Sequence, residues 1–316
     1  MADSINIIER GDVGSELMPD QVVTEIIQEV PKASVMLSHA KQVRMSSKKY
    51  KQPVLATLPE AYWVDGDMGL KSTSKSDWTG LEIVAEEMAV IVPIPDAVVE
   101  DSKINLWDAV KPLIAEAIGK KLDAACIFGA DKPATWPDAI VAAATAAGNA
   151  VARTATTDLG QNVAELGAKV AKQGYGINGF VSKPGMQWEL VGLRNQQGDP
   201  IYTPLPGSPA NGLYGYELNE VMNGAWDASA AELVALDWSK QLIGIRQDVT
   251  YRIFEEGVIS DSKGKILLNL MQQDTKALRV VFRVGYQVAK PKTRAQGELA
   301  YPGGVITPLA ADSSGE

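Results

Sequence analysis

Residues 61–129 contain, in direct succession, a polar loop, an apolar strand that ends at two prolines, and a long amphipathic helix. The loop is bracketed by Trp63 and Trp78 and is punctuated by Gly66 and Gly69, which favour turns. No cluster of catalytic residue types lies anywhere in this stretch. A projecting loop with aromatic ends, beside a rigid strand and helix, is typical of a segment that contacts another subunit.

The helix opens at Asn105, where Asp108 three residues later is a weak variant of a capping box. It runs to about Phe128 and ends at Gly129, so some 22 residues span about 33 Å at roughly 1.5 Å each. Pro112 predicts either a late start of the regular helix, near Asp108, or a kink. The apolar stripe comprises Leu106, Val110, Leu113, Ile114, Ala117, Ile118, Leu122 and Ala125.

Two further segments have the periodicity of strands. Residues 88–92 are continuously apolar and predict a buried strand that stops at Pro93 and Pro95, which lack backbone donors. Ala277–Ala289 alternates, with Arg279 and Arg283 on one face and an apolar opposite face. That apolar face comprises Leu278, Val280, Phe282, Val284, Tyr286 and Val288.

Ahead of these elements, the residues after Pro19 predict a helix up to Pro31, and residues 32–55 have an extended pattern. We interpret this N-terminal segment as an arm that packs on a neighbour, or as an edge strand of the same chain. Residues 159–173 predict another helix, which GYGING follows at 174–179.

Composition excludes several functional classes. The formal net charge is −9 and no Lys/Arg run exceeds two residues, which argues against direct DNA binding. The lone Cys126 lies in a helical stripe and predicts a buried structural thiol, and the lone His39 cannot supply a histidine-based metal site. The start has neither a basic nor an apolar signal region, so we expect cytoplasmic synthesis without export and no membrane.

The motifs that suggest chemistry lack their required context. GYGING matches a dinucleotide fingerprint, but here a helix precedes it and a strand follows, so we interpret it as a glycine-ended helix and a turn. Asp65 and Asp67 have the spacing of a calcium loop without the rest of the ligand series. We therefore predict no catalytic residue, no cofactor, no metal and no enzymatic activity.

The order of the elements resembles that of the major capsid proteins of tailed bacteriophages, which have the Hong-Kong-ninety-seven-like coat fold. The matching stretches cover most of residues 14–295 and are similar to the family's arm, loop entry, strands and spine helix. They read SELMPDQVVTEIIQEVPKASVMLSHAKQVRMSS, AYWVDGDMG, LEIVAEEMAVIVPIPDAVVEDS, LWDAVKPLIAEAIGKKLDAACIFGA, LYGYELNEVM, ALDWSKQLIGIRQDVTYRI and ALRVVFRVGYQVAKPKTRA.

The resemblance implies an α+β subunit with an N-terminal arm, an extended loop, a peripheral domain of spine helix and long strands, and an axial domain. On this basis we expect five segments along the chain. These are the arm (1–52), the extended loop (53–80), the peripheral domain (81–158), the axial domain (159–265), and the returning peripheral strands with the tail (266–316).

The implied function is that of a major capsid protein whose pentamers and hexamers form an icosahedral shell around phage DNA, without sequence-specific DNA binding. The protein would be made in the bacterial cytoplasm and end in the virion. Its expected partners are itself, a separate scaffolding protein, a portal and a decoration or cement protein. The alternative is the shell of an encapsulin-type nanocompartment, which has the same fold and holds cargo enzymes.

Two groups of residues are expected to matter for assembly. The spine-helix core is Leu106, Val110, Leu113, Ile114, Ile118 and Leu122, and the intersubunit contacts are Trp63, Asp65, Asp67, Lys71, Lys75 and Trp78. Some members of the family join a loop lysine to a neighbour's asparagine, but no pattern selects an asparagine here, so we expect no covalent cross-link. We also expect no cleavage of the N-terminal segment.

Overall fold

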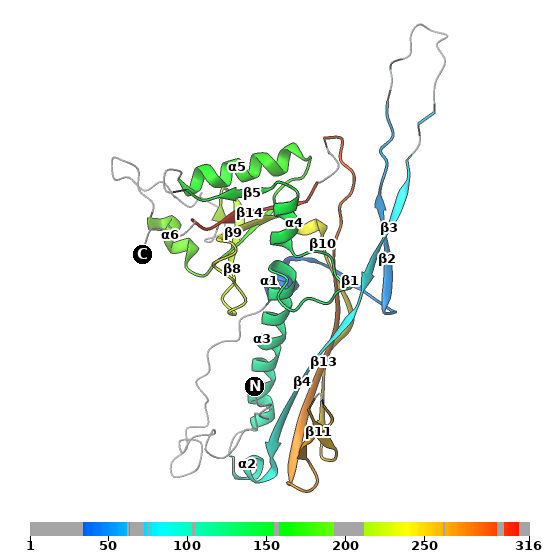
Figure 1. Ribbon diagram of the computed structural model, residues 1–316, viewed down its shortest axis with the longest axis vertical. Helices are drawn as coiled ribbons and strands as arrows, with labels where there is room; N and C mark the ends of the chain where they lie inside the picture. The colour runs from blue at the N-terminus through cyan, green and yellow to red at the C-terminus, as the bar shows by residue number, and fades with distance from the viewer. Residues whose placement is uncertain are drawn as a thin grey trace. The chain divides into compact units, whose positions relative to one another are not determined.

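The computed structural model describes residues 34–61, 63, 73–74, 76–102, 105–154, 158–192, 212–261, 263–295 and 300–309. In this part the chain forms two compact units (Figure 1). The first unit contains the described residues of 86–118 and 247–284, and the second contains those of 33–85, 119–246 and 285–316. Each unit is therefore assembled from segments that are far apart in the sequence.

The first unit is built on β4 (Glu86–Pro95) and on the parts of β13 (Thr275–Val288) and β10 (Gln241–Phe254) that lie within 247–284, with β13 in the middle. β4 and β13 pair antiparallel, from Glu86 opposite Val284 to Pro95 opposite Thr275. The alternation predicted for β13 is confirmed, because its six apolar residues from Leu278 to Val288 are all buried. The period-two pattern thus identified a long strand with one continuous apolar face.

Strand β4 is longer than predicted, because it continues through Pro93 and ends at Pro95. The prediction that Pro93 stops the strand is wrong. β4 stands at the end of the sheet order β1-β10-β13-β4, so among the described strands it has a hydrogen-bonded neighbour on one side only. An edge strand tolerates prolines, since the missing donors need not belong to the ladder.

Two helices complete the first unit's core. α2 (Asp96–Asp101) follows β4 directly, and α3 (Leu106–Ile127) is the long helix. Ile94, Val98 and Leu106 pack together there, so the end of β4, α2 and the start of α3 share one cluster. α3 begins at Leu106, directly after the predicted opening at Asn105, and it includes Pro112 in its interior. The short strands β11 (Val258–Ser260) and β12 (Ile266–Asn269) pair with each other.

The second unit contains a six-stranded mixed sheet in the order β5-β14-β9-β6-β8-β7. Its two central strands, β9 (Leu233–Leu236) and β6 (Gly179–Ser182), are buried at every residue. Such strands need apolar or small residues throughout, since both faces are covered. The others are β5 (Ala150–Ala152), β14 (Gly303–Thr307), β8 (Tyr216–Glu220) and β7 (Gly212–Leu213).

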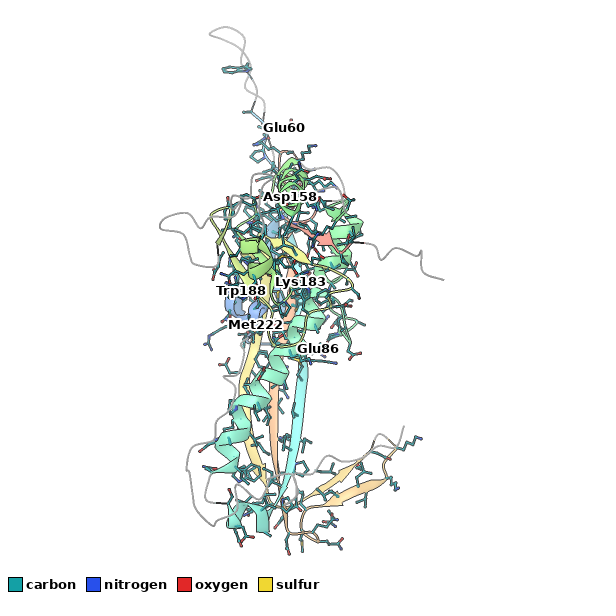
Figure 2. All side chains as sticks on the ribbon, turned by 90° about the vertical axis from the view of Figure 1, so that its left-hand side faces the viewer. Glu60, Glu86, Asp158, Lys183, Trp188 and Met222 are labelled. Atoms are coloured by element: carbon teal, nitrogen blue, oxygen red, sulfur yellow. The ribbon has the colours of Figure 1, made fainter. Side chains whose placement is uncertain are left out.

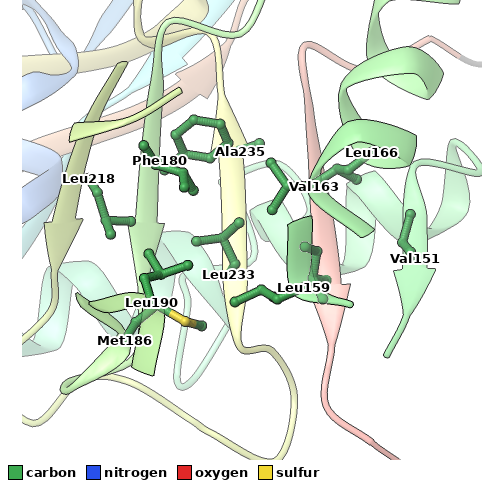
Figure 3. Packing of buried hydrophobic residues seen from close by; sticks show 12 residues of the cluster. Val151, Leu159, Val163, Leu166, Phe180, Met186, Leu190, Leu218, Leu233 and Ala235 are labelled. Carbon is green, nitrogen blue, oxygen red and sulfur yellow. The ribbon is translucent and has the colours of Figure 1, made fainter. Parts of the chain in front are cut away.

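Helices α4 (Ile140–Ala146), α5 (Leu159–Lys172) and α6 (Met186–Gly192) belong to the same unit. α5 contributes Leu159, Val163 and Leu166 to a cluster with residues of β6, β9 and α6 (Figure 3). The full cluster comprises Val151, Leu159, Val163, Leu166, Phe180, Met186, Leu190, Leu213, Leu218, Leu233, Ala235 and Ile306. The sheet and helices α5 and α6 thus share one buried core.

The N-terminal part of the second unit holds α1 (Val35–His39), β1 (Lys41–Arg44) and the two-stranded ribbon β2 (Lys49–Leu55) and β3 (Trp78–Val84). β1 pairs with β10 in parallel. The extended conformation predicted for residues 32–55 is wrong for Val35–His39, where a helical turn forms. Ser34 caps this turn by accepting a hydrogen bond from the backbone N–H of Leu37.

Candidate assembly surfaces

The β2–β3 ribbon is held by its own ladder. The two strands pair antiparallel from Lys49 opposite Val84 to Leu55 opposite Trp78, and form a sheet of their own in the described chain. Lys49 Nζ lies 2.8 Å from Glu82 Oε1. The hydrogen bond and the opposite charge raise the pKa of Lys49 and lower the pKa of Glu82. Both side chains are solvated, so the pair orders the surface more than it stabilises the fold.

A small apolar cluster attaches the root of the ribbon to the rest of the second unit. Ile83 of β3 is fully buried with Met45 and with Leu242 of β10. Gly285 of β13 permits this approach, because a Cβ there would lie 2.6 Å from the carbonyl oxygen of Val84. Gln287 also donates to the carbonyl of Glu82 at 3.1 Å. The ribbon is therefore fixed at one end by packing.

The other end of the ribbon carries the predicted contact residues. Trp78 is 67% exposed and Trp63 is 101% exposed. Asp65, Asp67, Lys71 and Lys75 lie outside the described residues. Two large indole side chains left in water within a single chain are unusual, since burial of such rings is strongly favourable. Both indole side chains therefore remain available for a contact outside the single chain.

The spine-helix residues fall into three groups. Leu106, Ile114, Ile118 and Leu122 are buried, and Val110 is half-buried. Leu113, however, is 45% exposed and does not belong to the buried stripe. The buried residues follow an i, i+4 row, and each step of that row rotates by about 40° around a helix with 3.6 residues per turn. Leu113 lies on nearly the same side of the helix as Leu106. The buried row has rotated away from that side by Ile114, so Leu113 is outside it.

A buried carboxylate that the sequence analysis did not single out ties α1 to α3. Asp123 accepts hydrogen bonds from Ser34 Oγ at 2.6 Å, from Asn223 Nδ2 at 2.7 Å, and from the backbone N–H groups of Val35 and Met36 at 3.1 Å each. Burial nevertheless raises the pKa of Asp123 above its ordinary value. The sequence pattern that could have revealed this residue is a single charged position within the apolar run LDAACIF. Asp123 therefore fixes the start of α1 against α3.

Ion pairs surround the buried Glu232, which stands just before β9. Arg153 lies 2.7 Å and Lys183 3.6 Å from its carboxylate oxygens, and Lys183 also lies 2.8 Å from Glu189 of α6. The preceding residue of α6, Trp188, is 79% exposed (Figure 2). The network thus orients a short helix that presents an indole side chain to solvent.

The motifs considered for chemistry remain without a site. Gly174 of GYGING has φ +79° and follows α5, while β6 begins at Gly179, so the interpretation as a glycine-ended helix and a turn is confirmed. Burial raises the pKa of the Cys126 thiol well above its ordinary value, as for a structural thiol. Over the described ranges, no three His, Cys, Asp or Glu side chains gather as a metal site. None of the described helices is long and apolar enough to cross a membrane.

Comparison with known proteins shows which family the chain belongs to. Residues 14–293 match the phage capsid family. The chain belongs to the phage capsid family. A curated relative, the major capsid protein of Staphylococcus phage 80alpha, is 27% identical over 285 residues, which are 88% of this chain and 83% of the relative.

Solved structures of phage proteins are similar to the chain over nearly its whole length. One from Microbacterium phage Oxtober96 is 37% identical with a TM-score of 0.81 and covers 96% of this chain and all of its own. Another, from Mycobacterium phage Cain, is 32% identical with a TM-score of 0.81 and covers 97% of this chain. The predicted α+β major-capsid fold is therefore confirmed, and the chain is a structural major capsid protein of a tailed-phage virion. The nanocompartment alternative is not favoured, since these relatives are phage proteins.

Proposed function

We propose that copies of this chain assemble as pentamers and hexamers into an icosahedral shell, with the β2–β3 ribbon as a main contact between copies. The observation that carries this proposal is the ribbon itself. Its root is anchored by the buried Ile83, while Trp63 and Trp78 near its far end are exposed. A rigid ribbon that presents two indole rings can bury them only against another surface, which a neighbouring copy supplies in a shell.

In this proposal the strands β4 and β13 and the helix α3 form the peripheral domain, and the six-stranded sheet with α5 and α6 forms the axial domain. Trp188 on α6, together with Met222 after β8, would contribute to contacts around the capsomer axis (Figure 2). Asp65, Asp67, Lys71 and Lys75 would add polar contacts beside the ribbon's tryptophans, without a covalent cross-link. Residues 1–52, as an arm, would tie neighbouring copies, and the hydrogen bonds of Ser34, Val35 and Met36 to Asp123 would anchor the second half of the arm on its own subunit.

The other partners in this proposal are those that a phage head requires. A separate scaffolding protein would guide assembly, a portal would occupy one vertex, and a decoration or cement protein would bind outside. The packaged DNA would be enclosed without sequence-specific contacts, which agrees with a net charge of −9. The protein would be made in the bacterial cytoplasm and perform no enzymatic reaction.

Electron microscopy of particles purified from infected cells tests this function. We expect closed shells with a tail vertex whose main protein is this chain, identified by mass spectrometry. Small tailless shells that contain an enzyme would support the nanocompartment alternative. Absence of the chain from every particle fraction would overturn the proposal, because a major capsid protein is the principal mass of the head.

A further inference from the structure

Strand β10 is paired on both sides for only part of its length. On the side away from β13, β1 pairs with residues 242–245. Beyond that ladder no described strand pairs with residues 247–254 on this side, so in the first unit this part of β10 is an outer strand of the sheet (Figure 2). The backbone N–H and C=O groups of such an edge are a template for another strand.

The two outer strands of this sheet differ in how far they are protected against such pairing. β4 carries Pro93 and Pro95, which cannot donate to an added strand, and begins with two glutamates of like charge. Residues 247–254 of β10 read QDVTYRIF, with no proline, no glycine and one charge of each sign. Prolines and like charges keep an edge from pairing, so the unprotected edge of β10 is the one suited to bind a further strand.

The sequence of this edge is complementary to itself. Two copies related by a two-fold axis perpendicular to the sheet would run antiparallel, and each side chain would stay on its own face. With the axis at Thr250, that residue lies opposite its counterpart, and Val249 lies opposite Tyr251. Asp248 of each copy then lies opposite Arg252 of the other. Hydroxyl pairs, pairs of a β-branched and an aromatic residue, and pairs of opposite charge all favour strand pairing.

The neighbouring registers are less complementary. An axis one residue earlier would place Arg246 opposite Arg252, and like charges directly opposite each other are destabilising. An axis one residue later would place Asp248 opposite the ring of Phe254, so the carboxylate would face no cation. Charge complementarity therefore selects the register centred on Thr250.

The side chains that this register brings together are available for the contact. Arg252 is exposed and forms no ion pair with a described carboxylate. Asp248 is exposed and has an interaction within its own chain, to which Arg252 of the other copy would be added, because a carboxylate accepts several hydrogen bonds. Tyr251 is 39% exposed, and Lys111 Nζ of α3 lies 5.9 Å from its ring centroid. The pairing would thus cover an aromatic ring and form two ion pairs.

We propose that two copies of this chain join through antiparallel pairing of their β10 edges, centred on Thr250. The sheets of two first units then form one continuous sheet across a local two-fold axis. This contact is distinct from the one proposed for the ribbon, since it uses neither β2 nor β3 nor their tryptophans. The inference rests on the proposed shell, which supplies the second copy.

Disulfide formation in particles of single variants tests the register directly. Cys126 is buried, so an introduced cysteine is the reactive one. Thr250→Cys would place the thiols of two copies directly opposite each other, so oxidised particles should yield a covalent dimer. Ile253→Cys is the matched control, because residue 253 is 48% exposed on the same strand and its two copies would lie about 20 Å apart. We expect at least tenfold more dimer from Thr250→Cys than from Ile253→Cys.

The outcomes separate the two proposals. Shells in which Thr250→Cys gives no dimer, or no more than Ile253→Cys, would overturn the pairing of β10 edges and leave the proposed shell standing. Absence of shells from the unmodified chain under assembly conditions would overturn the proposed function instead. A dimer from Thr250→Cys alone supports both.

A charge swap gives an independent measurement that introduces no cysteine. Asp248→Arg should lower the yield of particles at least tenfold, because the new arginine would face Arg252 of the other copy, and Arg252→Asp should act alike. A chain with both changes restores opposite charges across the contact and should regain a yield within about threefold of the unmodified chain. The two positions lie about 14 Å apart on their own strand, so this rescue requires two copies. A double variant that is folded, by thermal unfolding, yet assembles no better than Asp248→Arg would contradict the pairing.

Discussion

The six-stranded sheet and the β2–β3 ribbon lie in the same unit but satisfy their side chains in opposite ways. In β6 and β9 every residue is buried, and α5 and α6 supply partners from the same chain. In the two strands of the ribbon, Ile83 is the one fully buried residue. Trp78 and Trp63, towards the far end, are exposed. The sheet therefore buries its side chains within the subunit, whereas in the proposed shell the ribbon buries its exposed side chains against another copy.

This difference predicts that mutations separate into two kinds. Changes in the sheet should destabilise the isolated subunit. Changes at the far end of the ribbon should leave the subunit folded and reduce assembly, because the lost contacts are made to another copy. The predictions below test that separation.

Leu166→Ala should have the largest effect on folding. Leu166 is fully buried on α5, and removing its side chain should lower the free energy of unfolding by about 3 kcal/mol. The matched change Val54→Ala, on the half-buried ribbon strand β2, should cost less than about 1 kcal/mol. Urea unfolding of isolated subunits measures both. Equal losses would contradict the separation.

Asp123→Asn should remove a pH dependence from the folded subunit. Because burial raises the folded-state pKa of Asp123, its contribution to stability is fully present below the unfolded pKa, about 4, and is lost as pH rises through the raised value. Asparagine does not titrate. The stability advantage of the unmodified chain over the variant, on the order of 1–2 kcal/mol at low pH, should therefore shrink as pH rises.

Urea unfolding at a series of pH values from 4 upward measures this difference. Ser34→Ala is a control that removes one donor to the same carboxylate and keeps the titrating group. An advantage that grows with pH would mean that the hydrogen bonds to the charged carboxylate outweigh its burial, contrary to this account.

Trp78→Ala should act on assembly alone. With 67% of Trp78 exposed, its loss should leave the thermal midpoint of the isolated subunit nearly unchanged. The yield of particles should fall about tenfold, because every copy would lose an aromatic contact with its neighbour. Size-exclusion chromatography after assembly, alongside thermal unfolding, gives both values. A large drop in the midpoint with normal assembly would reverse the assignment.

The smallest effect is expected at the exposed ion pair of the ribbon. Lys49→Ala breaks the contact with Glu82. The side chains of both residues are solvated. We expect no measurable shift in the thermal midpoint at physiological salt, because surface pairs of this kind contribute little. Val54→Ala provides the reference for packing in the same ribbon. A shift larger than that of Val54→Ala would show that the pair holds the ribbon together.

The sequence predicted the elements whose signal is local. The alternation in Ala277–Ala289 identified β13, and the apolar stripe with Gly129 after it identified α3. Both patterns depend on residues a few positions apart, which a single sequence displays. The position of Leu113 was wrong because the buried row drifts around the helix, and which part of that drift is covered depends on elements elsewhere in the chain.

The remaining features depend on contacts between distant residues. α1 forms where Ser34 meets Asp123, which is 89 residues away, so no local pattern predicts it. β4 continues through Pro93 because it is an edge strand. Its place at the edge depends on the order of the strands in the sheet, which the local sequence does not display. The open groove lined by Glu87, Arg252 and Arg279 likewise combines residues of the three strands β4, β10 and β13. The order of motifs nevertheless carried the family resemblance, because it does not require any of these contacts.

Hydrogen exchange, compared between isolated subunits and assembled particles, tests the central claim that the ribbon is completed by another copy. Backbone amides of Trp78–Val84 and Lys49–Leu55 should exchange at least tenfold more slowly in particles. Those of β6 and β9 should change little, because the subunit already buries them. Ribbon amides that exchange equally fast in subunits and particles would contradict the account.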